Sequence, residues 1–298
     1  MSFASLFAAL LASTSLQAEP PAETPTELDD VIVDGRPIDQ RVRSFVDEVI
    51  AAPNGRGPAR WSSRICVGAV NFRNDAAQFM VDRISQVAVD IGLDIGEPGC
   101  RPNILVIGSS DGAGFARGLV EARPAVFRPG GSGMTLDRAA LDAFQSGQAP
   151  VRWWHVAVPT NADTGQIATR MPGYEPPVIS STVSSRLRTR IRNDLNRVIV
   201  IVDVNRATGK NFAQLADYVA MVSFSQVDAD ADISGYDSIL NLFNQSGSTA
   251  LTAWDRDYLH ALYSAELDRA SPVQQAGEIQ RLMARRERNA AESDGAQD

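Results

Sequence analysis

The stretch NRVIVIVDVNRATGKNFAQLADYVAMVSFSQVD, residues 196–228, decides the fold. Residues 198–204 are aliphatic apart from Asp203, a pattern typical of a strand that is buried on both faces. A short turn follows, and Asn211 is a candidate N-cap for a helix over residues 212–227 that is apolar on almost every side. Such a helix must be buried, so the sequence predicts a core strand followed by a central helix.

One stripe of this predicted helix is not plainly apolar. It contains, at three- and four-residue spacing on a single face, Gln214, Asp217, Tyr218 and Met221. A carboxylate on a buried helix needs a partner. We expect Asp217 either to meet solvent or to pair with an arginine, rather than to take part directly in chemistry.

Several segments resemble proteins of a known family. The strand, LADYVAMVSFSQVD, SILNLF and LTAWDRDYLHALY resemble a family of uncharacterised exported bacterial proteins over most of residues 35–265. More remotely they resemble zincin metallopeptidases, whose buried helix carries H-E-x-x-H and whose later helix carries a D-x-x-x-L-x-x-L-Y-like pattern. Asp217 and Met221 stand where the two ligand histidines would be, and Tyr218 where the general-base glutamate would be. The resemblance implies an α+β fold, a single mixed-sheet domain with a buried central helix, zincin-like in its second half, with a degenerate metal site.

The histidine content also argues against a metal centre. The chain has only His155 and His260, which lie far apart and in no zinc-ligand motif, so we expect no metal and no cofactor. Residues 228–232, DADAD, resemble the start of an EF-hand loop, but Ile233 and Ile239 occupy the positions of its glycine and its bidentate glutamate. A solvated acidic turn is favoured there over a weak calcium site.

A serine hydrolase is the main enzymatic alternative. Residues 108–112, GSSDG, fit the G-x-S-x-G motif after a predicted strand. Ser110, Asp203 and His260 follow in the chain order of an α/β-hydrolase triad. However, no HGGG-like element precedes the motif and His260 lies on the polar side of a predicted helix, so a glycine-rich turn is favoured. No Walker lysine follows, which disfavours nucleotide binding. The other alternative is a metal-dependent hydrolase with an unusual carboxylate site.

The two ends of the chain differ in composition from its middle. Residues 1–18 are apolar and small, which predicts a signal peptide, and the acidic, proline-rich residues 19–35 predict a disordered linker. Residues 36–270 are the expected α+β domain, and residues 271–298 a polar tail, helical and then disordered. The leader implies a periplasmic or secreted protein, and no later stretch is long and apolar enough to span a membrane.

Hydrophobic periodicity predicts the other elements. We expect strands over residues 61–70, 103–108 and 151–159, and helices over residues 38–51, 75–91, 136–144, 184–196 and 253–267. The only two cysteines, Cys66 and Cys100, lie near the ends of the first β-α-β unit, and export favours a disulfide between them.

The predicted strand over residues 151–159, VRWWHVAVP, places Trp153 and His155 on one face. They could form the floor of a ligand groove, but the favoured interpretation is that His155 is a hydrogen-bonded residue of the core. The net charge of −8 argues against binding to nucleic acid. The sequence thus predicts an exported, non-catalytic pseudo-enzyme that acts as a binding or structural protein of the cell envelope, its partner being an unidentified ligand or envelope protein.

Overall fold

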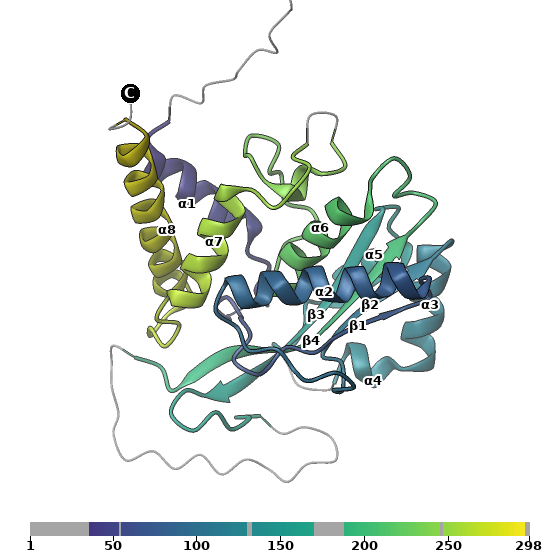
Figure 1. Ribbon diagram of the computed structural model, residues 1–298. Helices are drawn as coiled ribbons and strands as arrows, with labels where there is room; N and C mark the ends of the chain where they lie inside the picture. Colours follow the sequence, from purple (N-terminus) through teal and green to yellow (C-terminus); the bar gives the residue numbers. More distant parts are fainter. Residues whose placement is uncertain (1–35, 54, 130–132, 170–187, 245–246, 296–298) are drawn as a thin grey trace, which may run out of the picture. The chain divides into compact units, whose positions relative to one another are not determined.

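A four-stranded mixed sheet lies at the centre of the fold, shown by the computed structural model in Figure 1. β2 (Ile104–Ser109) pairs in parallel with β1 (Val67–Val70) on one side and with β4 (Ile191–Asp203) on the other. β3 (Val151–Asn161) pairs antiparallel with β4, so the strand order is β1-β2-β4-β3. The predicted α+β class with one mixed sheet is confirmed.

β4 is the core strand, as its sequence predicts. Val198, Val200 and Val202 belong to the hydrophobic core on one face of the sheet, whereas Ile199 and Ile201 belong to the core on the other face. Because β4 lies between β2 and β3, both of its edges are also paired. Each fully buried aliphatic side chain contributes about 1.5–3 kcal/mol relative to an exposed one, so this strand anchors both layers.

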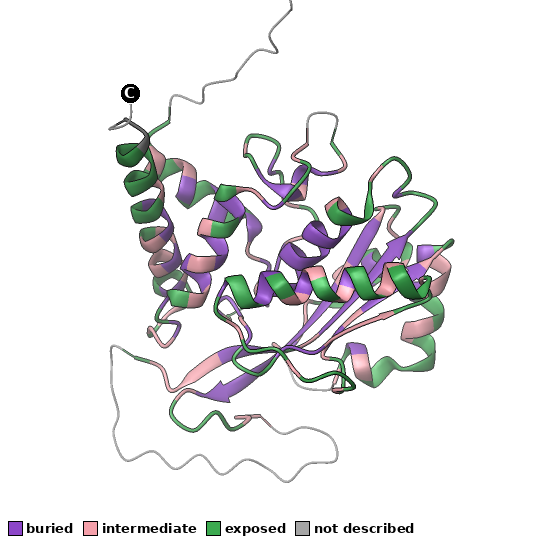
Figure 2. Ribbon diagram, viewed as in Figure 1, coloured by how far each residue is buried: buried purple, intermediate pink, exposed green. Residues whose placement is uncertain are grey.

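Helices cover both faces of the sheet (Figure 2). On one face lie α2 (Asn74–Asp90) and α6 (Phe212–Phe224), which share the larger core cluster. On the other face lie α3 (Gly112–Ala122), α4 (Pro124–Phe127) and α5 (Arg138–Ser146). The outer surfaces of α2 and α3 are exposed, whereas α6 is buried along most of its length.

The central helix α6 starts at a complete capping box. The side chain of Asn211 accepts from the backbone N–H of Gln214, and the side chain of Gln214 accepts from the N–H of Asn211, both at 2.9 Å. This exchange satisfies backbone donors that the first turn of a helix leaves free. All residues from 215 to 224 are buried, which confirms the predicted central helix, although it ends at Phe224 and not at residue 227.

Three further helices and one short turn of 3-10 helix complete the described unit. α1 (Ile38–Val49) packs against α8 (Pro272–Gly295), which also packs against α7 (Ala253–Ser264). The 3-10 turn η1 (Ile239–Asn241) follows the loop after α6. Ile279, Met283 and Ala284 of α8 are buried in the main core, so this helix belongs to the same unit as the sheet.

The structure describes residues 36–53, 55–129, 133–169, 188–244 and 247–295. The predicted signal peptide at residues 1–18 and the predicted linker at residues 19–35 lie outside these ranges. None of the helices in the described ranges combines the length and the hydropathy that a membrane span requires.

The helix predicted over residues 184–196 is wrong where the structure describes it. Residues 191–196 belong to β4 and pair with the far half of β3. The predicted apolar stripe used Ile191 and Leu195, but a four-residue spacing is also a multiple of two and so fits one face of a strand. Residues 191–195 form a strand because they pair with residues 157–161 of β3. A β-bulge lies where the register shifts between Val156 and Ala157.

The predicted disulfide is confirmed. Cys66 and Cys100 are bonded, with their Cα atoms 6.1 Å apart and a sequence separation of 34. The bond ties the segment before β1 to the segment before β2, at the amino ends of two paired strands.

Candidate functional site

Asp217 joins two helices rather than lining an open site. Its carboxylate accepts from Arg83 of α2 at 2.6 Å from Nε and 3.0 Å from Nη2, and from the backbone N–H of Leu251 at 3.0 Å. The hydrogen bonds that it donates to this carboxylate raise the pKa of the Arg83 guanidinium. Of the two expectations for Asp217, pairing with an arginine is therefore found, and both carboxylate oxygens are engaged.

Two other members of the predicted stripe have structural roles. Gln214 completes the capping box of α6, so its side-chain oxygen is used by the backbone of Asn211. Met221 is fully buried in the main core. Of the three side chains at the zincin-like positions, Asp217 is thus in an ion pair and Met221 is in the core, and neither faces solvent.

Tyr218 is the one member of the stripe that lies against a cavity. Its ring packs edge-on between Trp153 of β3 and Phe243, with centroids at 6.1 and 5.2 Å. Only 7% of the residue is exposed, and no hydrogen bond to its hydroxyl is found within the described ranges. Burial raises the pKa of this phenol, so it stays neutral and keeps its proton as a donor.

The cavity next to Tyr218 has a volume of about 340 Å³. Tyr218, Trp153 and Leu240 provide its apolar walls, and Asn244 and the loop over residues 227–234 provide its polar rim. Trp153 is fixed in place because its indole N–H donates to the backbone carbonyl of Val227 at 2.9 Å. The pocket therefore lies between the edge strand, the central helix and the loop that follows this helix.

The rim loop is ordered by its own aspartates. Asp228 accepts from the backbone N–H of Asp230 at 3.0 Å, and Asp232 accepts from the backbone N–H of Ser234 at 3.2 Å. Such Asx turns hold the backbone without any metal. The loop is also attached to α1, because Glu48 accepts from the N–H of Asp232 at 2.8 Å.

These aspartates do not converge on one point. In the part of the chain that the structure describes, no group of three His, Cys, Asp or Glu side chains is placed to hold a metal ion. The favoured interpretation of residues 228–232 as an acidic turn agrees with this geometry.

The residues of the hydrolase alternative are only partly brought together. Ser110 follows β2 and Asp203 ends β4, and these neighbouring strands pair Ser109 with Asp203. The Asp203 carboxylate, however, accepts from the backbone N–H of Gly112, at the start of α3, and from those of Asn205 and Arg206 in the turn after β4. Asp203 thus serves the backbone, not a histidine.

His260 lies elsewhere in the fold. It belongs to α7, on the opposite side of the unit from the carboxyl ends of β2 and β4 (Figure 1). Burial lowers its pKa, and its charged neighbours are on α7, on α8 and at the end of α2. Neither histidine of the chain therefore stands beside Ser110.

His155 is a core residue, as the favoured interpretation of its strand predicts. Its Nε2–H donates to the backbone carbonyl of Val222 at 2.7 Å, and the residue is buried against α6. Burial lowers its pKa to about 4, so it is neutral at pH 7. Of the residues named for the alternative groove, Trp153 lines a cavity and His155 does not.

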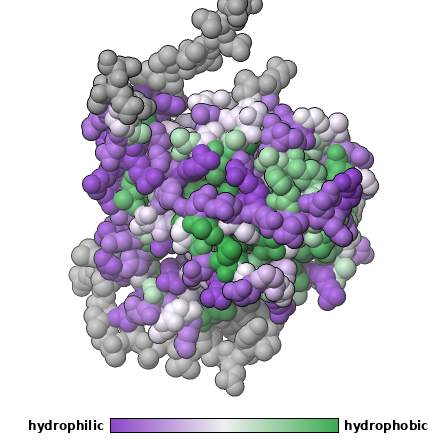
Figure 3. Space-filling model, viewed as in Figure 1, coloured by the Kyte–Doolittle hydropathy of each residue, from purple (hydrophilic) through white to green (hydrophobic). Residues whose placement is uncertain are grey.

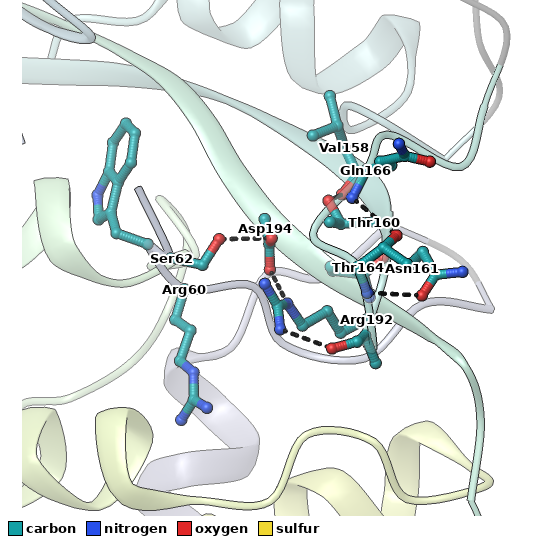
Figure 4. Close-up of polar contacts among 12 residues, drawn as sticks. Arg60, Ser62, Val158, Thr160, Asn161, Thr164, Gln166, Arg192 and Asp194 are labelled. Carbon is teal, nitrogen blue, oxygen red and sulfur yellow. Dashed lines mark hydrogen bonds and ion pairs between the residues drawn. The ribbon is translucent and has the colours of Figure 1, made fainter. Parts of the chain in front are cut away.

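A second polar cluster lies at the amino end of β4 (Figure 4). Asp194 accepts from Ser62 Oγ at 2.5 Å and from Arg192 Nε at 2.8 Å. The side chain of Arg60 points away from Asp194 and donates to the carbonyls of Leu262 and Ala265. Each group of this cluster has a partner inside the fold, so the cluster ties β4 to the segment before β1 and offers no open site.

An apolar surface lies at the carboxyl edge of the sheet. Phe72 and Phe212 pack edge-on with centroids 6.0 Å apart, and with Phe79 they line a shallow pocket of about 520 Å³. Figure 3 shows hydrophobic residues gathered over the part of the unit that carries α2 and α6, whereas the surface over α8 is mainly hydrophilic. The charged side chains on this pocket's lining, Arg73 and Asp75, pair with each other.

Sequence reasoning missed Phe243 and Asn244 as pocket residues. Phe243 ends the SILNLF stretch and Asn244 follows it, and their place beside the Tyr218 pocket depends on how the chain returns after α6. No spacing rule predicts that return.

No family model matches this chain, and neither a curated protein nor a solved structure matches it significantly.

Proposed function

We propose that the chain is an exported, non-catalytic binding protein of the cell envelope, with a zincin-like arrangement in its second half that no longer serves a metal. This proposal rests on where the side chains of the stripe on α6 lie. Asp217 is used in an ion pair, Met221 is in the core, and Tyr218 alone lines a pocket. A zinc peptidase needs three converging ligands and a bound water at this place.

Binding is favoured over a purely structural role because the pocket is a formed cavity. Its walls come from a strand, a helix and a loop that is fixed by hydrogen bonds to α1 and within itself. A preformed concave site with apolar walls and a few polar groups is the usual form of a small-molecule site. Export is supported by the disulfide, because such bonds persist in oxidising compartments.

The first experiment tests the absence of catalysis. Protein purified without chelator is analysed for bound zinc, assayed with casein and small esters, and incubated with a fluorophosphonate probe. We expect no stoichiometric zinc, no hydrolysis and no labelling. About one zinc per chain that is lost in Asp217→Ala, or labelling that is lost in Ser110→Ala, would show that the protein is an enzyme.

The second experiment tests binding at the pocket. Ala229 is exposed and lines the pocket, so Ala229→Phe fills its mouth without disturbing the core. Ala290→Phe, at an exposed position on α8, is the matched control. In a saturation-transfer NMR screen with cationic, neutral and anionic fragments, we expect binders that are lost with Ala229→Phe and kept with Ala290→Phe. A screen without such a binder would contradict the proposed function.

A further inference from the structure

The rim of the Tyr218 pocket carries negative charge that nothing in the described structure neutralises. Asp228, Asp230 and Asp232 all line it, and no lysine, arginine or histidine does. Within the described ranges none of the three forms an ion pair. The Asx turns use only Oδ1 of Asp228 and Oδ1 of Asp232, which leaves their other oxygens and the whole Asp230 carboxylate for a ligand.

The wall of the pocket carries a polar group that also lacks a partner. Tyr218 is more than nine-tenths buried, yet its hydroxyl makes no hydrogen bond in the described part of the chain. The hydroxyl keeps contact with solvent through the pocket and is therefore accessible to a ligand. A ligand that reaches the Tyr218 hydroxyl with a hydrogen-bond donor gives this group its partner.

The wall also presents two aromatic rings. Trp153 is held by its bond to the carbonyl of Val227, and Tyr218 packs against it edge-on. Indole and phenol faces attract positively charged groups. Carboxylates at the rim and aromatic rings at the wall therefore favour the same sign of charge in a ligand.

We infer that this pocket binds a small organic cation that carries an ammonium group. The inference rests on the proposed binding function and names the chemical class of its ligand. The ammonium lies between the aromatic wall and the rim aspartates, and the remainder of the ligand, limited by the volume of about 340 Å³, contacts Leu240 and Tyr218. The net charge of −8 adds a general attraction for cations.

A bare metal ion fits the same charges less well. Calcium needs six to eight oxygen ligands around one point, whereas the described aspartates do not converge in this way. Aromatic rings also supply no ligand to a hard cation. An organic ammonium needs no such convergence, because its charge interacts with carboxylates and rings over several ångströms.

The test uses the full exported chain and matched probes. Choline carries a quaternary ammonium, and 3,3-dimethyl-1-butanol is its uncharged isostere; n-butylammonium, butyrate and calcium chloride complete the set. Binding is measured by isothermal titration and by saturation-transfer NMR. We expect choline or n-butylammonium to bind at least about tenfold more tightly than the neutral isostere and butyrate.

Two variants separate charge from fold. The triple change Asp228→Asn, Asp230→Asn and Asp232→Asn keeps the Asx-turn acceptors and should weaken choline about tenfold or more. Its control is Glu121→Gln, Asp142→Asn and Glu292→Gln, which removes three exposed charges elsewhere and should leave affinity within about twofold. Tyr218→Phe should weaken n-butylammonium, whose ammonium has N–H donors for the hydroxyl, more than choline, whose quaternary ammonium has none.

The salt dependence does not rely on any variant folding. Between about 0.01 and 0.5 M NaCl, choline binding should weaken and binding of the neutral isostere should not. If the isostere or butyrate binds as well as choline, the ligand class is wrong while binding at the pocket stands. If calcium binds stoichiometrically and choline does not, the site is a metal site. If no probe and no fragment binds in a manner sensitive to Ala229→Phe, the proposed function itself fails.

Discussion

The guanidinium of Arg83 donates two hydrogen bonds to the carboxylate of Asp217, and this pair joins α2 to the buried helix α6. The two partners differ in environment, because 34% of the Arg83 side chain is exposed and only 3% of the Asp217 side chain is. The carboxylate therefore depends on Arg83 and on the backbone N–H of Leu251 to replace the water it has lost.

Replacement of Asp217 by alanine should lower the free energy of unfolding by about 2–4 kcal/mol, because Arg83 and the Leu251 amide both lose their acceptor. Urea denaturation measures this change. Asp217→Asn keeps one acceptor oxygen for the amide and should cost less than the alanine variant. Asp82→Ala, at an exposed position on α2, is the control and should stay within about 0.5 kcal/mol of wild type. A loss below about 0.5 kcal/mol for Asp217→Ala would mean that the ion pair is not formed in solution.

The disulfide between Cys66 and Cys100 should be present in protein isolated from an oxidising compartment. Intact-mass analysis with alkylation, before and after reduction, should show both thiols blocked only after reduction. In the loop-entropy model, closure over 34 residues contributes about 3–4 kcal/mol. The double variant Cys66→Ala and Cys100→Ala should therefore unfold at lower urea, whereas equal alkylation before and after reduction would show that the bond does not form.

The core was the part of the fold most open to prediction from sequence. Residues 198–202 show their burial directly, because an uninterrupted aliphatic run is typical of a strand with two covered faces. The central helix is as clear, since Asn211 and Gln214 give it a capping box. Residues 191–196 were misassigned because Ile191 and Leu195 fit both periods, and only the pairing with β3 decides between them.

The candidate site was harder to predict because its contacts are far apart in the sequence. The stripe containing Asp217 and Tyr218 is visible in the sequence, but its two members turn out to face different neighbours. Arg83 precedes Asp217 by 134 residues, and no pattern along the chain links them. Trp153 was a candidate for a groove, yet its position beside Tyr218 follows from the antiparallel pairing at the sheet edge.

Asp255 should be a second residue on which the fold depends. It is fully buried and accepts from Ser238 Oγ at 2.5 Å, from the N–H of Ile239 at 2.8 Å and from the N–H of Thr252 at 3.0 Å. Asp255→Ala leaves these donors unpaired and should cost about 3 kcal/mol or more, measured by urea denaturation.

The neighbouring cap offers a scale for this effect. Thr252 Oγ1 accepts from the N–H of Asp255 and caps α7, so Thr252→Ala should cost only about 1 kcal/mol. Equal losses for Thr252→Ala and Asp255→Ala would show that Asp255 acts only as part of the cap.

His155 should make stability depend on pH in a defined window. In the folded chain its pKa is lowered to about 4 because it is buried without a charged partner, whereas an unfolded histidine has a pKa of about 6.5. A lowered histidine pKa means that the unfolded chain takes up the proton first. The contribution of neutral His155 to the free energy of unfolding is thus fully retained above about pH 6.5. It is lost as the pH falls from there towards 4, and the loss at pH 5 is about 1–3 kcal/mol.

The measurement is the free energy of unfolding in urea at pH 7, 6 and 5 for wild type and for His155→Gln. The glutamine keeps a donor for the Val222 carbonyl but does not titrate. We expect the variant to be less stable than wild type at pH 7, and its free energy of unfolding should fall less between pH 7 and pH 5. Carboxylates titrate in both proteins, and taking the difference between the two slopes removes their effect. His260→Gln, at a half-buried position on α7, is the control for a histidine outside the core. Parallel pH profiles for wild type and His155→Gln would show that His155 is hydrated, and not held neutral against Val222.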